Sequence, residues 1–230
     1  MLKTSLHQGL PIALTIAISL STLAAAPAIA ATKSLDVTSL EEIEISANVE
    51  VEFRQSDTVS AELIGDEDDF ERLKITIGSD KLKIKQKKNS LFSNYTELDI
   101  RVVLRAPTVE ELDLSLGLRA DLQLGNQDDL RIDANTGVEV EISGTCDDVE
   151  YDISTGAEVE AGELRCNDAD VTANTGGEIE LYASGKLEAR ATLGGEITVL
   201  GRPKSVDLGT SFGGEIEILD DGDPTIDDEI

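Results

Sequence analysis

The chain of 230 residues contains no tryptophan, a single histidine and two cysteines, and only 3% of its residues are aromatic. The histidine, His7, lies in an apolar leader, so the rest of the chain has no imidazole. Histidine-dependent acid–base catalysis, catalytic triads and the usual zinc sites are therefore excluded. The few phenylalanines and tyrosines are expected to fill the core and not to form platforms for sugars or cations.

Basic residues are also scarce. The chain has 19 Lys and Arg against 47 Asp and Glu, and without Lys3 of the leader the 18 remaining basic residues leave a net charge of 18 − 47 = −29. Such a field repels phosphate backbones and anionic lipids, which excludes nucleic acid as a partner. Because 40% of the residues are hydrophobic and alternate regularly with polar ones, we expect a folded chain with a charged shell and not a disordered one.

Residues 1–30 have the pattern of a secretory signal peptide. Lys3 precedes an apolar run over residues 10–26, and Ala28 and Ala30 supply the small residues of a cleavage site. The alternative is an uncleaved membrane anchor, which the prolines at both ends of the run disfavour. No later run approaches spanning length, so we expect an exported protein without an integral membrane span, located in the periplasm, at the cell surface or outside the cell.

Six copies of one unit occupy residues 112–219. They read LDLSLGLRADLQL, LRIDANTGVEVEI, VEYDISTGAEVEA, ADVTANTGGEIEL, LEARATLGGEITV and SVDLGTSFGGEIEI. Their anchor glycines, which are expected to form positive-φ turns, are Gly117, Gly137, Gly156, Gly176, Gly194 and Gly213, spaced 20, 19, 20, 18 and 19 residues apart. A period of about 19 residues built from alternating strands predicts an all-β solenoid in which each copy is one coil.

The alternation assigns each position of a coil to a side. Apolar residues third and fifth after the anchor, such as Val140, Val159 and Ile179 in the third place, should form internal rows. The glutamates between them should face water in two columns. The residues that complete each coil, such as SGTCDD and GELRCND, are expected to form a short third side or a broad bend.

The two cysteines test this register. Cys146 lies nine residues after its anchor glycine and Cys166 ten after the next, so both occupy the same place in neighbouring coils. Stacked strands lie about 4.8 Å apart, within the reach of a disulfide. Behind a secretory signal we expect the bridge to form, and the alternative is two small buried thiols.

Residues 31–111 alternate with period two but lack the glycine register. The turn signals GSDK and KNSLFSN suggest hairpins or irregular first coils that cap the stack and protect its strand edges. The run KLKIKQKK at 81–88 is locally basic; as a solvated strand face it needs no ligand, and it could equally meet an acidic surface of the same protein. Residues 220–230 form an acidic tail that could guard the last coil.

The repeats, together with VEVEFRQ near the start, LRAPTVEELDLS at the junction and LEARATLGGEITVLGRPKSVDLGTSFGGEIEI at the close, resemble the head GIN domain of putative auto-transporter adhesins. The similarity covers roughly residues 35–219. The resemblance implies a right-handed parallel β-solenoid at the cell envelope and brings no catalytic residues. The density of glutamate after the anchor glycines departs from the family pattern.

The first glutamate column is the one candidate site with a physical argument. Stacked carboxylates repel, and divalent cations such as Ca²⁺ could bridge acids of adjacent coils, although a solvated face is the simpler interpretation. The candidate ligands are Glu139, Glu158, Glu178, Glu196 and Glu215. A weaker candidate is DDGDP at 220–224, which lacks the full spacing of a calcium loop.

Every acidic column repeats from coil to coil, whereas an active site usually interrupts a repeat. We therefore predict a non-enzymatic, adhesin-like binding module whose partner is an envelope or extracellular glycan or protein. The alternatives are a carbohydrate-active lyase or hydrolase, since paired carboxylates can cleave glycosidic bonds, and a purely structural spacer.

Overall fold

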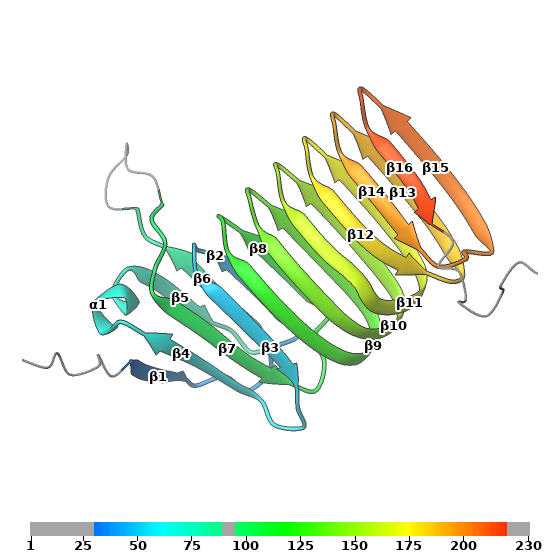
Figure 1. Cartoon of the computed structure of the whole chain (residues 1–230). Coiled ribbons are helices and arrows are strands. Elements are labelled where there is room, and N and C mark those ends of the chain that lie inside the picture. Colours follow the sequence, from blue (N-terminus) through cyan, green and yellow to red (C-terminus); the bar gives the residue numbers. More distant parts are fainter. Residues whose placement is uncertain (1–29, 89–94, 220–230) are drawn as a thin grey trace, which may run out of the picture.

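The computed structural model describes residues 30–88 and 95–219. Within them, sixteen strands form one hydrogen-bonded sheet that winds into an elongated rod (Figure 1). The strands are β1 (Ala31–Leu35), β2 (Glu42–Ser46), β3 (Glu50–Gln55), β4 (Ser60–Gly65), β5 (Leu73–Ile77), β6 (Lys81–Gln86), β7 (Ile100–Ala106), β8 (Glu111–Ser115), β9 (Arg119–Asn135), β10 (Glu139–Ser154), β11 (Glu158–Asn174), β12 (Glu178–Ala183), β13 (Lys186–Thr192), β14 (Glu196–Leu200), β15 (Ser205–Ser211) and β16 (Glu215–Leu219), and the helix α1 spans Glu67–Phe70.

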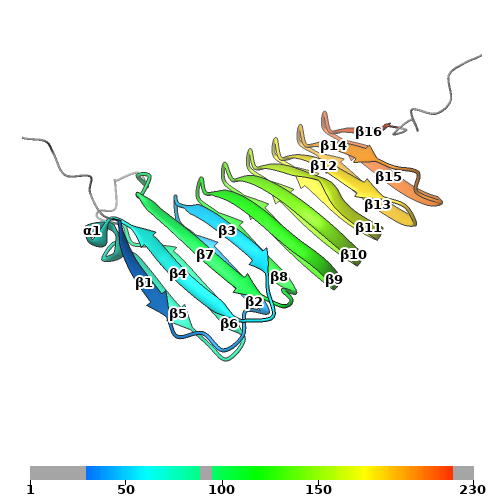
Figure 2. The ribbon, with the colours of Figure 1, turned by 60° about the horizontal axis from the view of Figure 1, so that its bottom comes forward.

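The regular coils stack in parallel along the rod, as Figure 2 shows for β9 to β16. The first halves of β9, β10 and β11 join β3, β12, β14 and β16 in one layer, called here the glutamate face. The second halves join β2, β8, β13 and β15 in the opposite layer, the aspartate face. Because β9 to β11 pass through both layers without a break, the residues between the two halves form a broad bend. The predicted parallel β-solenoid is confirmed.

The core lies between the two faces and consists of apolar rows that run along the rod. Val140, Val159 and Ile179 pair in register and are 4%, 1% and 1% exposed. In the inner strands, such as β2, β8 and β14, alternation buries every second residue, so one continuous cluster extends from the first coil to the last complete one. In the last coil the equivalent positions are exposed to solvent, and Leu208 is 44% exposed.

Each coil turns from the aspartate face to the glutamate face at a tight corner. The anchor glycines all have positive φ, as predicted, between 68° and 81°. The residue before each glycine also has positive φ, which the sequence did not indicate. These residues are Leu116, Thr136, Thr155, Thr175, Leu193 and Phe212. Two successive left-handed residues make the short reversal that a two-residue turn needs, at a cost for side chains that are not glycine.

The first coils do not stack in the order of the chain. β2 and β3 lie directly beside β8 and β9, although the paired residues are 69 positions apart in sequence. β6 and β7 form the next layer outward, pairing in parallel with β2 and β3. Residues 31–111 therefore contribute two coils to the same core as the regular repeats.

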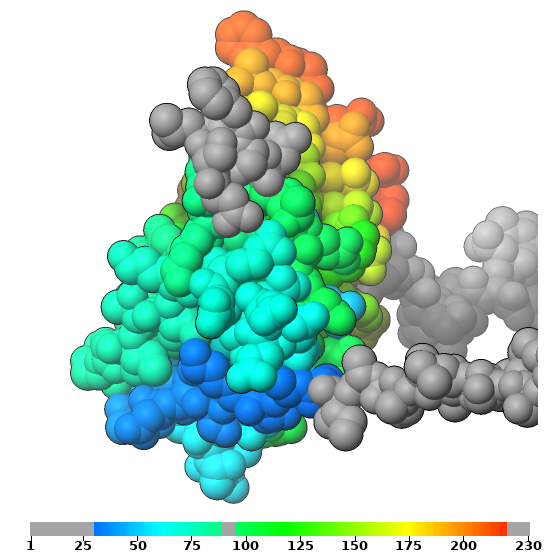
Figure 3. Space-filling view, turned by 90° about the vertical axis from the view of Figure 1, so that its left-hand side faces the viewer, coloured from blue at the N-terminus to red at the C-terminus, as the bar shows by residue number. Residues whose placement is uncertain are grey.

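The outermost layer of this end is antiparallel. β5 pairs with β6 across the predicted GSDK turn, and β1 pairs with β4, which pairs with β7. Figure 3 looks onto this end and shows it covered by the first segments of the chain. The turn signal KNSLFSN does not join a hairpin, because β6 and β7 on either side of it pair with β2 and β3 and belong to opposite faces. Most of that turn lies outside the described residues.

The basic run in β6 meets an acidic strand, as the sequence allowed. Lys83 Nζ lies 2.5 Å from Glu44 Oε2, and Lys85 Nζ lies 2.8 Å from Glu44 Oε1. Lys81 Nζ lies 3.0 Å from Glu42 Oε2. Burial acts to raise the pKa of Glu44, but the hydrogen bonds from the two lysines hold it below its usual value. Three lysines of β6 thus pair with the two glutamates of β2.

The predicted disulfide is confirmed. Cys146 and Cys166 pair in register in β10 and β11, with their Cα atoms 4.5 Å apart. The expected signal peptide, apart from Ala30, and the acidic tail lie outside the described residues. Among the helices of the described segments, none has the length and apolarity needed to cross a membrane.

Candidate functional site

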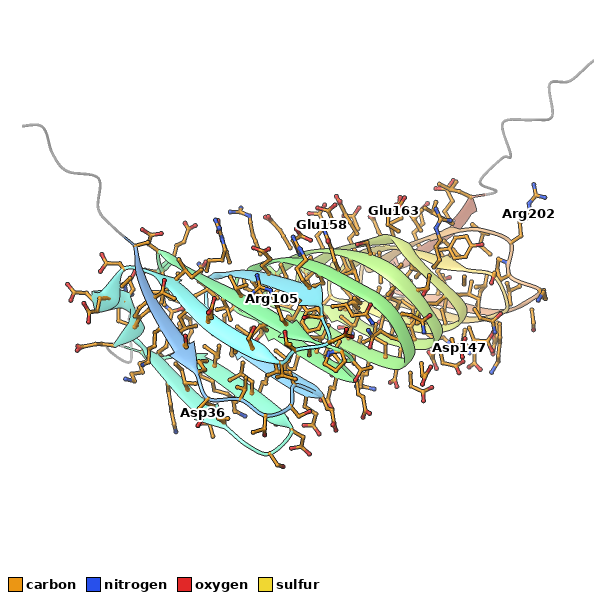
Figure 4. All side chains as sticks on the ribbon, turned by 90° about the horizontal axis from the view of Figure 1, so that it is seen from below. Asp36, Arg105, Asp147, Glu158, Glu163 and Arg202 are labelled. Atoms are coloured by element: carbon orange, nitrogen blue, oxygen red, sulfur yellow. A yellow bond between two sulfur atoms is a disulfide. The ribbon has the colours of Figure 1, made fainter. Side chains whose placement is uncertain are left out.

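The glutamate face carries two outward columns of acidic side chains. The predicted column is present, because each of its members pairs in register with the next: Glu139, Glu158, Glu178, Glu196 and Glu215. The second column lies two residues further along each strand: Asp121, Glu141, Glu160, Glu180, Thr198 and Glu217. Alternation points both columns to solvent, and Figure 4 shows Glu158 directed away from the rod.

Arginines compensate this acidic surface at the end nearest the cap. Arg119 Nε donates a hydrogen bond of 2.5 Å to Glu139 Oε2, and this bond lowers the pKa of Glu139. Arg54 Nη2 donates one of 2.6 Å to Asp121 Oδ2. Glu158, Glu178 and Glu196 have other glutamates as their neighbours along the column. Negative charge therefore accumulates towards the last coils.

A shallow hollow of about 430 Å³ lies where the compensated and uncompensated parts meet. Its charged lining comes from five adjacent strands, β7, β3, β9, β10 and β11. The lining includes Glu50, Arg101, Arg119, Glu139, Glu158 and Glu160. Both guanidinium groups of the hollow are already paired with carboxylates of its lining, Arg101 with Glu50 and Arg119 with Glu139.

The aspartate face carries a larger groove, which sequence reasoning missed. The groove has a volume of about 730 Å³ and follows the bend of β9, β10 and β11. Asp129, Asp148 and Asp168 line it in one register. Burial, followed by repulsion from Glu188, raises the pKa of Asp170 beside them. The sequence signal was the aspartate that repeats in CDD, QDD and CND. The bend that brings these aspartates into one groove is not marked by any local sequence pattern.

Arg131 crosses this groove and is held by carboxylates. Its Nη2 donates a 3.0 Å hydrogen bond to Asp133 Oδ1, and its Nη1 pairs with Glu150 of the next coil. Arg190, which stands in the same column as Asp133, donates a 2.9 Å hydrogen bond to Asp207 Oδ2 of the next coil. Both arginines connect coils and reduce repulsion on this face.

The arrangement of the acidic side chains limits the number of protein ligands that a cation could bind. Within residues 30–88 and 95–219, no group of three or more Asp, Glu, His or Cys side chains is arranged to hold a metal ion. The glutamate column offers pairs of carboxylates from adjacent coils and leaves further ligands to come from elsewhere. The calcium expectation for this column stays a prediction, and the second candidate at 220–224 lies outside the described residues.

Most aromatic side chains are structural, as expected. Phe53 and Tyr151 are fully buried, and the Arg165 guanidinium lies 4.4 Å from the centre of the Tyr182 ring. The expectation of core aromatics is wrong for Phe212, which is 83% exposed at the corner of the last coil. Its position follows from the corner geometry, which points this side chain away from the core.

Comparison with known proteins agrees with this architecture. Residues 39–203 match the family described as "Putative auto-transporter adhesin, head GIN domain". A putative adhesin from Bacteroides fragilis is 16% identical, with a TM-score of 0.58 over 83% of this chain and 97% of that chain. A putative adhesin from Parabacteroides distasonis is also 16% identical, with a TM-score of 0.42 over the same shares. No curated protein matches the sequence significantly. At such identity the Bacteroides structure shows a shared fold.

Proposed function

This chain belongs to the family of putative auto-transporter adhesins with a head GIN domain, and from that membership we propose that it is an exported, non-enzymatic binding module of the cell envelope. The secretory leader in its sequence supports export to the periplasm, the cell surface or the medium. The names of its structural neighbours support an adhesin-like role. Its partner is an envelope or extracellular glycan or protein.

The observation that carries this proposal is the unbroken register of the glutamate column. Five carboxylates, the first of them paired with Arg119, stand in line at the strand spacing of about 4.8 Å, without an inserted loop between them. A repeated, flat and exposed array suits a ligand that is itself repetitive or extended, because each coil can make the same contact. An enclosed pocket that surrounds one small substrate is not needed for such binding.

The charge of the column defines two kinds of ligand. A cationic segment of a protein would pair with it directly. An acidic glycan would need divalent cations between its own carboxylates and those of the protein, and Ca²⁺ prefers such oxygen ligands. The glutamates supply pairs of ligands in this arrangement and the glycan supplies the others, so affinity depends on both together. We therefore propose that the affinity for such a glycan depends on the concentration of Ca²⁺.

Incubation with acidic polysaccharides, with and without millimolar Ca²⁺, tests the proposal. We expect retention of the polysaccharide that increases with Ca²⁺, and no new reducing ends or unsaturated products. Turnover of the polysaccharide would contradict a purely binding role. The cation part fails separately if the melting temperature is indifferent to Ca²⁺ and calorimetry detects no heat, with or without glycan.

The groove on the aspartate face favours one second candidate, a carbohydrate-active enzyme. Its carboxylates are close in register, and the raised pKa of Asp170 is a property of general acids in glycoside hydrolysis. Substitution of Asp170 by Asn separates the candidates. Loss of turnover would identify an enzyme, whereas a binding module on the opposite face would keep its retention unchanged.

A further inference from the structure

The last coil of the solenoid is an exposed apolar surface. Seven large hydrophobic side chains are exposed in the described residues, and six of them lie in the stretch 193–219: Leu193, Val206, Leu208, Phe212, Ile218 and Leu219. Clusters of this kind mark sites of association. Val206, Leu208 and Ile218 continue the internal rows of the core, so in every earlier coil their equivalents are covered by the next coil.

The same coil presents open strand edges. Among the strands of residues 30–88 and 95–219, β15 pairs only with β13, and β16 pairs only with β14. Both strands lie at the end of the rod (Figure 1), so their outer edges, opposite β13 and β14, have no strand partner among the described residues. The opposite end of the rod, onto which Figure 3 looks, carries the antiparallel pairs β1–β4 and β5–β6. Repeat proteins need a polar terminal cap for solubility, and the described coils have one at one end only.

The acidic tail has the wrong sequence for covering this surface as a further coil. A covering strand needs apolar residues at alternate positions, but residues 220–230 read DDGDPTIDDEI, in which Ile226 and Ile230 are four apart with acids between them. Six of the eleven residues are acidic. They would be placed beside Asp207, Glu215 and Glu217 of the last coil, and like charges repel.

We propose that the last coil docks against the last coil of a second copy of this chain, about a two-fold axis, so that β15 of one copy pairs antiparallel with β16 of its partner. This register places Leu208 opposite Ile218 and Thr210 opposite Ile216, inward row against inward row. It also places Asp207 opposite Leu219 and Gly209 opposite Glu217. No like charges face each other, and the two-fold axis repeats every contact. The two cores then join into one, and each copy supplies the missing coil of the other.

Stacking in a head-to-tail series fits less well. The edge strands at the other end are β1 and β5, and of the exposed large hydrophobic residues only Ile77 lies there. Lys33 and Lys74 would attract the acidic last coil, but its apolar side chains would be covered by a polar edge. A two-fold contact buries apolar against apolar and closes after two copies, whereas head-to-tail stacking leaves ends open and continues into fibres.

The two arrangements respond oppositely to salt. In the two-fold dimer two strongly acidic ends approach each other, so screening removes repulsion and tightens association. A head-to-tail series joins lysines to acids, and salt weakens it. Sedimentation velocity of the purified protein from low micromolar to about 100 µM, in about 0.1 M and 1 M NaCl, measures both size and salt response.

We expect a dimer that is favoured at high salt and grows no larger. Leu208→Lys should weaken dimerisation at least about tenfold, because it introduces a charge into the centre of the contact. The residue is already 44% exposed in one copy, so the fold should persist. The matched control is Ile77→Lys, which changes a residue 40% exposed at the opposite end and should leave the dimer intact. A monomer at every concentration in both salts, an open series of sizes, or a dimer insensitive to Leu208→Lys would each overturn the proposal.

A cross-link defines the register. Gly209 and Glu217 lie on opposite outer faces of one coil, so the double variant Gly209→Cys, Glu217→Cys should form disulfides only between copies. We expect a covalent dimer on a non-reducing gel, and free thiols under oxidising conditions would contradict the pairing of β15 with β16. Failure here leaves the binding role of the glutamate column untouched, because that column is exposed whether or not the ends are joined.

Discussion

Cys146 and Cys166 occupy equivalent places in successive coils, and their Cα atoms lie 4.5 Å apart although 20 residues separate them in sequence. The disulfide therefore links two residues that are one repeat period apart. It also joins β10 and β11, two of the three long strands that pass through both faces, at their bend.

The first prediction concerns this bridge. Its removal by the double variant Cys146→Ala, Cys166→Ala should lower the free energy of unfolding by about 3 kcal/mol, since the closed loop spans 20 residues. Denaturant unfolding with and without a reducing agent measures the loss. Reductant should destabilise the native protein and have no effect on the double variant. Equal stability of all four samples would mean that the bridge constrains nothing.

The second prediction concerns pH. Burial, followed by repulsion from Glu44 and then Asp133, raises the pKa of Asp113. A carboxyl whose pKa is raised by folding stabilises the fold while protonated, so its contribution is complete below the ordinary carboxyl pKa and is lost as pH rises through the folded value. Asp113→Asn should therefore raise stability at pH 7, by about 0.5 kcal/mol, and the gain should vanish in acid.

Asp133 provides the control for that prediction. It stands next to Asp113 in the same column but accepts a hydrogen bond from Arg131. Asp133→Asn removes a charge-assisted partner and should not stabilise the protein at pH 7. If both variants behave alike across the pH range, the effect comes from net charge alone and not from the surroundings of each carboxyl.

The third prediction compares two adjacent glycines of one corner. Gly176 has a φ of 71°, and an added Cβ would meet no atom within 4 Å, so Gly176→Ala should cost only the left-handed strain of about 1–2 kcal/mol. At Gly177 an added Cβ would lie 2.6 Å from the Ile153 carbonyl oxygen. Gly177→Ala should cost more, because backbone must move. Thermal unfolding of both variants gives the order, and a reversed order would contradict the corner geometry.

The fourth prediction concerns the order of the coils. Ser46 and Ser115 pair in register, and the Ser115 hydroxyl donates a 2.9 Å hydrogen bond to the Ser46 hydroxyl. The double variant Ser46→Cys, Ser115→Cys should therefore form a disulfide across 69 residues. Mass spectrometry of the unreduced protein after proteolysis detects it. Two free thiols would mean that the coil of residues 42–55 lies elsewhere in the stack.

The regular coils were predictable because there the order of stacking equals the order of the chain. Each residue meets its equivalent one period later, so Val140 over Val159 and Cys146 over Cys166 could be inferred from spacing alone. Alternation then set the inward and outward sides, which is why the glutamate column appeared where it was expected.

The strand pairing of the first coils could not be predicted in this way, because their partner strands are not one repeat period away in the sequence. Ser46 meets Ser115 rather than a residue of the next segment, and no local pattern marks that choice. The partner of Glu139 was missed for a different reason: Arg119 does lie one period earlier, but it occupies a position that is acidic in later coils. The groove could not be predicted because it depends on the curvature of the bend. The exposure of the apolar end coil could not be predicted because it depends on whether another segment covers that coil, and none of the described residues does.

The most direct test of the proposed binding role is a glycan array and cell-surface pull-down that compares the native protein with two neutralised variants. One carries Glu158→Gln, Glu178→Gln and Glu196→Gln on the glutamate face. The other carries Asp148→Asn, Glu150→Gln and Asp168→Asn on the aspartate face, which matches the change in charge. We expect the native protein and the aspartate-face variant to be retained by the same ligand and the glutamate-face variant to lose it. Equal retention of both variants would contradict a binding site on the glutamate column.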